Sequence, residues 1–160
     1  MVDFVNKIVS ILLIFVMFVL APVLYAYSSN YSTGQRLVLN DVTTFLDKMS
    51  DKGEINDEDM QDFYASINSH GFALDAVVQK FSKTIITDAK GNLKTEYIAS
   101  DDVMEQFLKD GTLTTVQLDK GDILKVHVDE VNISKGRRFI YLISGIDNGA
   151  LEFSMADVIK

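Results

Sequence analysis

The stretch IVSILLIFVMFVLAPVLYA, residues 8–26, decides the architecture of this chain. Ser10 is its only polar side chain, and the sequence holds no other apolar run of this length. At 1.5 Å per residue, a helix of roughly 19 residues reaches about 28 Å, close to the hydrocarbon thickness of a bilayer. The stretch therefore predicts a helix that is able to span a membrane.

Three interpretations of this helix are open. A cleaved signal peptide usually has an apolar core of about 7–15 residues and a clearly positive leader, whereas the leader MVDFVNK carries one acid and one base. A permanent anchor fits the length, with Tyr25, Tyr27 and Tyr31 as an interfacial aromatic belt. A stalk that exchanges lipid for copies of itself in a filament needs an apolar surface all round and weak fastening on its outer side, and both are present.

Pro22, the only proline, lies inside the apolar run. Proline has no N–H and its ring clashes with the preceding helical turn, so we expect a kink or a loosened turn at about residues 18–22. The segment Ser28–Gly34 is rich in Ser, Asn, Thr and Gly. These residues are mediocre or poor helix formers, so this segment is expected to stretch or unwind at low cost.

The apolar run, the Ala21-Pro22 step and the tyrosines after it resemble type IV pilin-like proteins, including the Tad-type pilin and TadE-like proteins of bacterial and mobile-element secretion systems. The resemblance covers about the first third of the chain. The usual prepilin signature, a Gly before the cleavage site and a Glu shortly after it, is absent.

This resemblance implies a structural subunit of an extracellular pilus-like filament. Its partners would be its own copies in a helical homopolymer, with the membrane before assembly and a pilus assembly machinery. The residues implied in filament-core packing are Ile8, Leu12, Phe15, Phe18, Pro22 and Tyr25. Asp3 and Lys7 would set the register between subunits. They also stand at i and i+4, which suits an ordinary ion pair at a membrane surface.

Charge is divided unevenly along the chain. The formal net charge is −8, and residues 1–40 contain Asp3, Lys7 and Arg36, a net of +1, which leaves −9 for residues 41–160. An acidic body without a basic stripe is unsuited to nucleic acid and is repelled by anionic lipid. We therefore expect a stalk at residues 1–50 and an acidic extracytoplasmic head at residues 53–160, first on the cytoplasmic membrane with the head outside and then in an extracellular filament.

Helical periodicity continues into the body. It predicts one apolar stripe at Val38, Val42, Phe45, Leu46 and Met49. This helix is expected to continue the stalk helix, which gives one long bent rod from about residue 2 to residue 51. Gly53 should end it. Asn56 should cap a second helix, whose inner stripe is Met60, Phe63, Tyr64 and Ile67 and which ends at Gly71.

From Phe72 the apolar residues alternate, which indicates strands. The sequence predicts a hairpin with its turn at DAKGN (88–92), a short helix at 101–109 capped by Ser100 and closed by Gly111, and strands in TTVQL, ILKVHVDEVNI, RRFIYLIS and LEFSMADVIK, with a turn at 145–149. The expected fold class is α+β: a long apolar helix, kinked near Pro22, packed on a small antiparallel sheet with short helices.

No catalytic or metal-binding motif is recognisable. The acidic run DKGEINDED (51–59) lacks the EF-hand order and is expected to cap a helix. His70 and His127 have no Cys, His or Glu at ligand spacing. Arg137 and Arg138 are expected to form a surface counterion patch. We therefore expect no enzyme, no cofactor, no metal and no small-molecule substrate. A single-pass, membrane-anchored binding or sensory domain is the alternative to the filament subunit.

Overall fold

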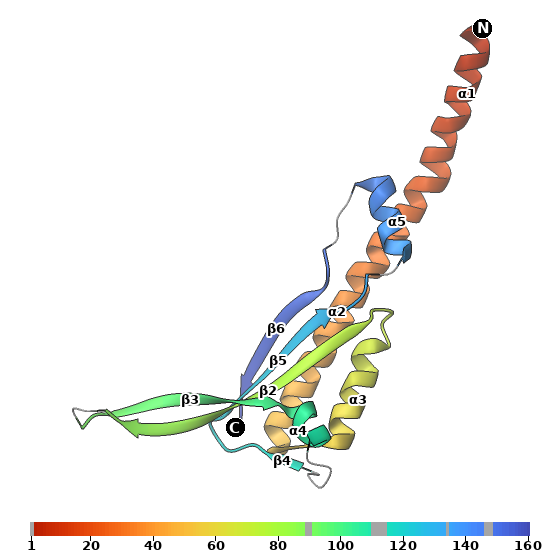
Figure 1. Ribbon diagram of the computed structural model, residues 1–160. Helices are drawn as coiled ribbons and strands as arrows, with labels where there is room; N and C mark the ends of the chain where they lie inside the picture. Colours follow the sequence, from red (N-terminus) through yellow and green to blue (C-terminus); the bar gives the residue numbers. More distant parts are fainter. Residues whose placement is uncertain (1, 89–90, 110–114, 134, 146–148) are drawn as a thin grey trace. The chain divides into compact units, whose positions relative to one another are not determined.

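The computed structural model describes residues 2–88, 91–109, 115–133, 135–145 and 149–160, and it confirms the α+β fold (Figure 1). The helices are α1 (Val2–Phe15), the π-helical η1 (Val16–Leu20), α2 (Ala21–Lys52), α3 (Asp57–Asn68), α4 (Val103–Lys109) and α5 (Lys135–Ser144). The strands are β1 (Glu54–Asn56), β2 (Leu74–Thr87), β3 (Leu93–Asp102), β4 (Thr115–Gln117), β5 (Ile123–Glu130) and β6 (Glu152–Val158).

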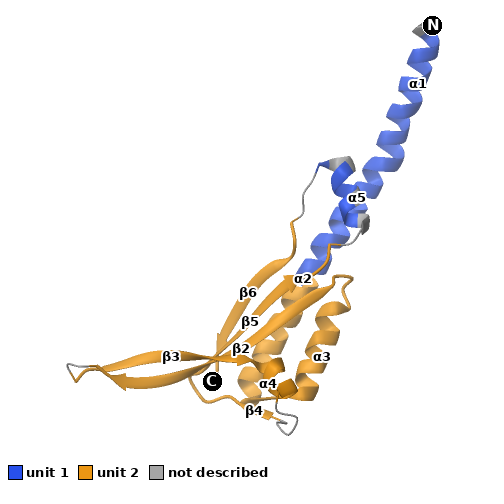
Figure 2. Cartoon of the chain, viewed as in Figure 1, with its two compact units in different colours: residues 1–36, 134–148 blue, residues 37–133, 149–160 orange. Residues whose placement is uncertain are grey.

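The chain divides into two compact units (Figure 2). Unit 1 comprises residues 1–36 and 134–148, and it contains α1, η1, the first half of α2, and α5. Unit 2 comprises residues 37–133 and 149–160, and it contains the rest of α2, α3, α4 and the described strands.

The N-terminal helix is loosened where Pro22 predicts it. In η1 the helix widens to a π turn, and the N–H of Ala21 donates to the carbonyl of Val16, five residues back. A π turn directly before a proline relieves the crowding between the proline ring and the preceding turn. The Ser-rich segment after it is helical, and Thr33 Oγ1 donates to the Ser29 carbonyl at 2.9 Å.

The second half of α2 supplies one side of the core of unit 2. The predicted stripe is confirmed, because Val38, Val42 and Met49 are fully buried and Phe45 and Leu46 nearly so. The N–H of Gly53, at φ +73°, donates to the Met49 carbonyl at 2.9 Å and ends the helix. Phe45 stacks on Phe63 of α3 with ring centroids 4.3 Å apart.

A four-stranded antiparallel sheet, in the order β3-β2-β5-β6, forms the other side of this core. Along β5 the burial alternates as predicted: Leu124, Val126 and Val128 are fully buried, and the residues between them face the open side. The short strands β1 and β4 pair separately. Beyond the register shift at Gln79 and Phe81, the β2–β3 hairpin projects from the sheet as a two-stranded arm (Figure 1).

The predicted cap of α4 is wrong. Strand β3 continues through Ser100 to Asp102, and Oδ1 of Asp102 lies 3.4 Å from the backbone N of Met104 in the first turn of α4. The side chains of Ser100 and Asp102 instead accept hydrogen bonds from the backbone of β2. Oδ1 of Asp102 accepts the Val78 N–H at 3.0 Å, and Ser100 Oγ accepts the Lys80 N–H at 3.1 Å. Side-chain oxygens thus complete the hydrogen bonds of β2 where the register shifts.

The predicted strand RRFIYLIS is also wrong, because this segment lies in helix α5. A short apolar run fits either period, and here Arg137 is buried and Ile140 half-buried at i and i+3, while Arg138 and Leu142 at i and i+4 are exposed. The predicted helix end at Gly111 and most of the predicted turn at 145–149 lie outside the described residues.

Candidate functional site

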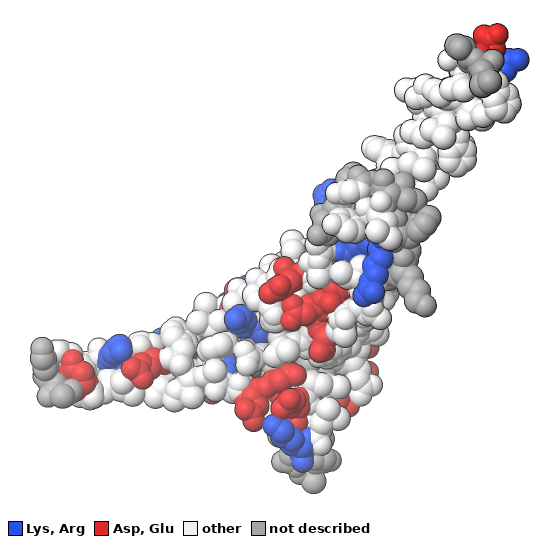
Figure 3. Space-filling view, turned by 45° about the horizontal axis from the view of Figure 1, so that its top comes forward, with Lys and Arg blue, Asp and Glu red and all other residues white. Residues whose placement is uncertain are grey.

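The apolar surface of the N-terminal helix is the first candidate site. The helix is long and apolar enough to cross a membrane, and no residue of its most apolar window is buried. The predicted packing residues all lie on this open surface, with exposed fractions of 48% for Ile8, 60% for Leu12, 53% for Phe15, 76% for Phe18 and 77% for Tyr25; Pro22 is exposed as well. In Figure 3 the tip of α1 carries acidic and basic side chains, and the helix surface next to the tip is uncharged.

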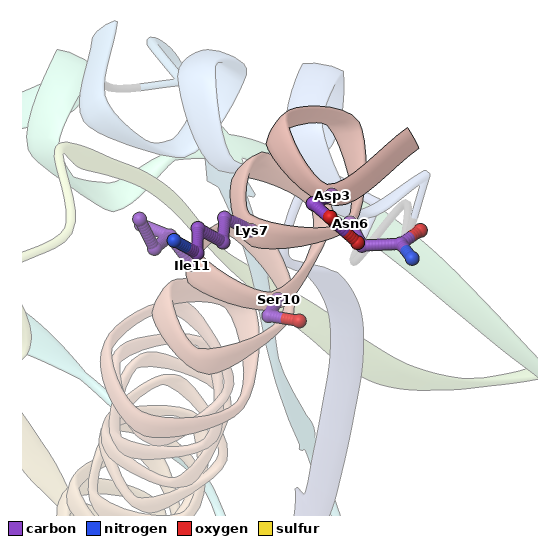
Figure 4. Close-up of a pocket in the computed structure, with 5 residues that line it drawn as sticks. All are labelled: Asp3, Asn6, Lys7, Ser10 and Ile11. Carbon is purple, nitrogen blue, oxygen red and sulfur yellow. The ribbon is translucent and has the colours of Figure 1, made fainter. Parts of the chain in front are cut away.

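A polar stripe follows one face of α1. Asp3, Asn6, Lys7 and Ser10, at i, i+3, i+4 and i+7, line a shallow hollow together with Ile11 (Figure 4). In Figure 4 the Lys7 side chain turns toward Ile11, whereas Asp3 points to the other side, beside Asn6. Both charges are therefore directed outward, where a group on another molecule can reach them.

A second polar stripe lies on the first half of α2. Tyr25, Ser28, Ser29, Ser32, Thr33 and Arg36 line another shallow hollow. Their spacing of three and four residues places them on one helix face. The apolar segment is thus bounded at both ends by a polar stripe.

The π turn changes which residues share a face. It adds one residue to a helical turn, and one residue corresponds to about 100° of rotation. Positions after η1, such as Pro22 and Tyr25, are consequently rotated relative to Ile8 and Leu12 by about that angle compared with an unbroken α-helix. A partner that packs along the whole apolar segment must therefore contact one helix face before η1 and a rotated face after it.

Arg137 does not belong to a surface patch, which corrects the expectation from the sequence. It is buried, its Nη2 donates to Tyr31 Oη at 2.9 Å, and its guanidinium lies 4.4 Å from the centre of the Tyr31 ring. Arg138 is exposed. The Arg137–Tyr31 contact joins α5 to α2 within unit 1 and combines a hydrogen bond with a cation–π interaction.

In unit 2 a buried carboxylate organises the start of α3. Asn56 caps the helix as predicted: its Oδ1 accepts the Asp59 N–H at 2.8 Å, and Oδ2 of Asp59 accepts the Asn56 N–H at 3.2 Å. Burial alone would raise the pKa of Asp59, but hydrogen bonds from Lys52 and Lys48 and from the Asn56 N–H lower it. The acidic run at residues 51–59 is therefore explained in large part by this cap.

A second buried carboxylate, Asp122, closes the turn before β5. Its oxygens accept the Lys83 N–H at 2.9 Å and the Asp119 N–H at 3.0 Å, and Lys80 Nζ lies 2.9 Å away. Burial opposes ionisation, yet the hydrogen bonds from Lys83, Lys80 and Asp119 lower its pKa. Gly121, at φ +93°, occupies the third position of this turn, where a type II turn requires a left-handed residue.

The two histidines have different surroundings. His70 follows the end of α3, and its Nε2 lies 2.8 Å from Oδ2 of Asp41 in α2. His127 lies on the open face of β5, with Nε2 2.9 Å from Oδ2 of Asp129 and Nδ1 2.7 Å from Ser154 Oγ of β6. The pairing of β5 with β6 also brings Glu152 beside this group, a neighbour that spacing along the chain cannot show.

No protein-family model, curated protein or solved structure matches this chain. The pilin-like resemblance therefore depends on the stalk sequence and on the architecture of a long apolar helix with a small antiparallel sheet.

Proposed function

We propose that this protein is the structural subunit of an extracellular pilus-like filament that assembles through its N-terminal helix. The observation that carries the proposal is the open apolar surface over α1, η1 and the start of α2, in which no residue of the most apolar window is buried. A continuous apolar surface of this size needs lipid or protein around it. A filament core of sister helices provides the second environment after the membrane has provided the first.

The distribution of burial along the helix indicates that its two parts have different contacts. Residues such as Phe15 and Phe18 are open, while Val38, Val42 and Met49, farther along the same helical stretch, are fully buried under the sheet. The later part of the helix thus packs in the core of the head, and the first part is free to pack against neighbouring subunits.

The polar stripes favour a filament over a monomeric anchor. Lipid already covers the apolar surface in a bilayer, so helix association there must gain from packing and from polar pairing. Asp3 and Lys7 point apart on the exposed face of α1 and offer charges of both signs to the next subunit (Figure 4). An ion pair in a packed core contributes to register more than to net stability.

The test is to shear cells that make the full chain, pellet the filaments from the supernatant and view them by negative-stain microscopy. Filaments containing residues 3–26 support the proposal. Protein found only in the membrane fraction supports the alternative, a membrane-anchored binding or sensory domain.

Phe18→Asp tests the stalk surface, with Leu93→Asp as the matched control. Both side chains are 76% exposed, and Leu93 lies on the β2–β3 arm. An Asp at the centre of a membrane helix costs about 3 kcal/mol, which the many Leu, Ile, Phe and Val residues, at about −0.3 to −0.6 kcal/mol each, outweigh. Phe18→Asp should therefore still insert but form no filaments, whereas Leu93→Asp should form them. Equal filament yields would contradict assembly through the stalk.

A further inference from the structure

The open face of the sheet carries a mixed group of one imidazole and two carboxylates. On β5, His127 and Asp129 are two residues apart and therefore point to the same side. Glu152 of β6 pairs directly with Asp129, and Ser154 pairs with His127. A nitrogen of His127 and a carboxylate oxygen each of Asp129 and Glu152 lie within 4.8 Å of one another.

The imidazole is held by both ring nitrogens. Nδ1 lies 2.7 Å from Ser154 Oγ, and Nε2 points at Asp129, 2.9 Å from Oδ2. Metal-binding histidines have this arrangement, in which one nitrogen faces the metal and the other is fixed by a hydrogen-bond partner. When Nε2 binds a metal, the proton of the neutral ring resides on Nδ1, which then donates to Ser154 Oγ.

The charges around this group favour a bound cation. Asp75 of β2 pairs directly with Asp129, which in turn pairs with Glu152, so three carboxylates form a row across three strands. Like charges directly opposite each other on a sheet are destabilising. Acidic side chains gather over the sheet in Figure 3. A divalent cation beside His127 relieves the repulsion within this row.

We propose that His127, Asp129 and Glu152 bind a divalent transition metal, for which Zn²⁺ is the probe. Imidazole nitrogen together with carboxylate oxygen suits Zn²⁺ better than Ca²⁺ or Mg²⁺, which prefer oxygen alone. Bonds of about 2.0–2.2 Å in a tetrahedron place ligand atoms about 3.4 Å apart. The exposed Glu152 side chain reaches that spacing by rotation, and solvent supplies the fourth ligand.

The site joins the edge strand β6 to β5, so its role is independent of whether the stalk forms a filament. Titration of the full chain in detergent micelles with Zn²⁺, by calorimetry and by ¹⁵N NMR of the histidine side chains, tests it. With only two histidines in the chain, the expected result is one equivalent of Zn²⁺ and a shift of the His127 Nε2 signal with the His70 signals unchanged.

Variants separate this site from general binding to acidic groups. His127→Gln and Glu152→Gln should each weaken Zn²⁺ binding at least about tenfold, and Ser154→Ala, which frees Nδ1, by about tenfold. His70→Gln is the matched control, because among the described residues His70 Nε2 pairs with one carboxylate, that of Asp41 at 2.8 Å. This variant should bind Zn²⁺ as the wild type does. Circular dichroism of each variant is the check that it is folded. Absence of Zn²⁺ binding to the wild type, or unchanged affinity in Glu152→Gln, overturns the proposal.

Discussion

Asp122→Asn should be among the most destabilising single-atom changes in the head. The Asp122 side chain is 3% exposed and accepts hydrogen bonds from two backbone N–H groups and from Lys80. An asparagine keeps one acceptor oxygen but turns an NH₂ group toward the remaining donors. Loss of one charge-assisted hydrogen bond and of the Lys80 pair should cost about 3 kcal/mol.

The matched control is Asp119→Asn in the same turn. Asp119 faces the same Lys80, at 3.8 Å, but its side chain is 88% exposed. An exposed pair of this kind contributes less than about 1 kcal/mol. Urea unfolding of the full chain in detergent, followed by circular dichroism, should show the Asp122→Asn midpoint about 1.5 M lower than the wild type, for an m-value of about 2 kcal/mol/M. The Asp119→Asn midpoint should be nearly unchanged.

The pH dependence provides a second readout. The pKa of Asp122 is lowered in the folded protein, so its ionised form stabilises the fold above the unfolded pKa of about 3.9. That contribution is lost as the pH falls through the folded value. The difference between wild type and Asp122→Asn should therefore shrink below about pH 4. A cost no larger than that of Asp119→Asn, or a difference that is constant from pH 7 to pH 3, would refute the reasoning.

Three further changes test other parts of the structure. Pro22→Ala should restore regular α-helical hydrogen bonds across residues 16–21, seen as amide chemical shifts in micelles; unchanged shifts would show that the proline does not cause the π turn. Tyr64→Phe removes the hydrogen bond that Tyr64 Oη donates to the Ala76 carbonyl; burial raises the pKa of this phenol to about 12. The loss should lower the free energy of unfolding in urea by about 1 kcal/mol. An unchanged free energy would mean that this bond adds no net stability. Gly121→Ala should cost about 1–2 kcal/mol, because φ is +93° and the added Cβ would lie 3.1 Å from Lys83 Cδ; an unchanged midpoint would contradict the left-handed turn.

The helical part of the fold was predictable because its signals are local. The Gly53 end and the Asn56 cap each depend on residues within about one turn of each other, and successive members of the stripe from Val38 to Met49 are three or four residues apart or adjacent. The alternation in β5 was equally clear, because one face of this strand is buried and the other is open.

The errors arose where pairing between distant segments decides the outcome. Ser100 has the side-chain chemistry of a helix cap, but at the register shift in β2 its Oγ accepts a hydrogen bond from the Lys80 N–H. RRFIYLIS suits a strand by composition, yet it forms a helix whose Arg137 packs on Tyr31. Glu152 reaches His127 only through the register of β5 with β6, which no spacing in the sequence reveals.

The central claim is that the apolar stalk packs on copies of itself in the working assembly. The most direct measurement is a helical reconstruction, at side-chain resolution, of filaments sheared from cells that make the full chain. We predict continuous helical density for residues 3–26 in the filament core, with Phe15 and Phe18 packed against neighbouring subunits. Filaments whose core lacks these residues, or a protein that is recovered only with lipid around its stalk, would contradict the account.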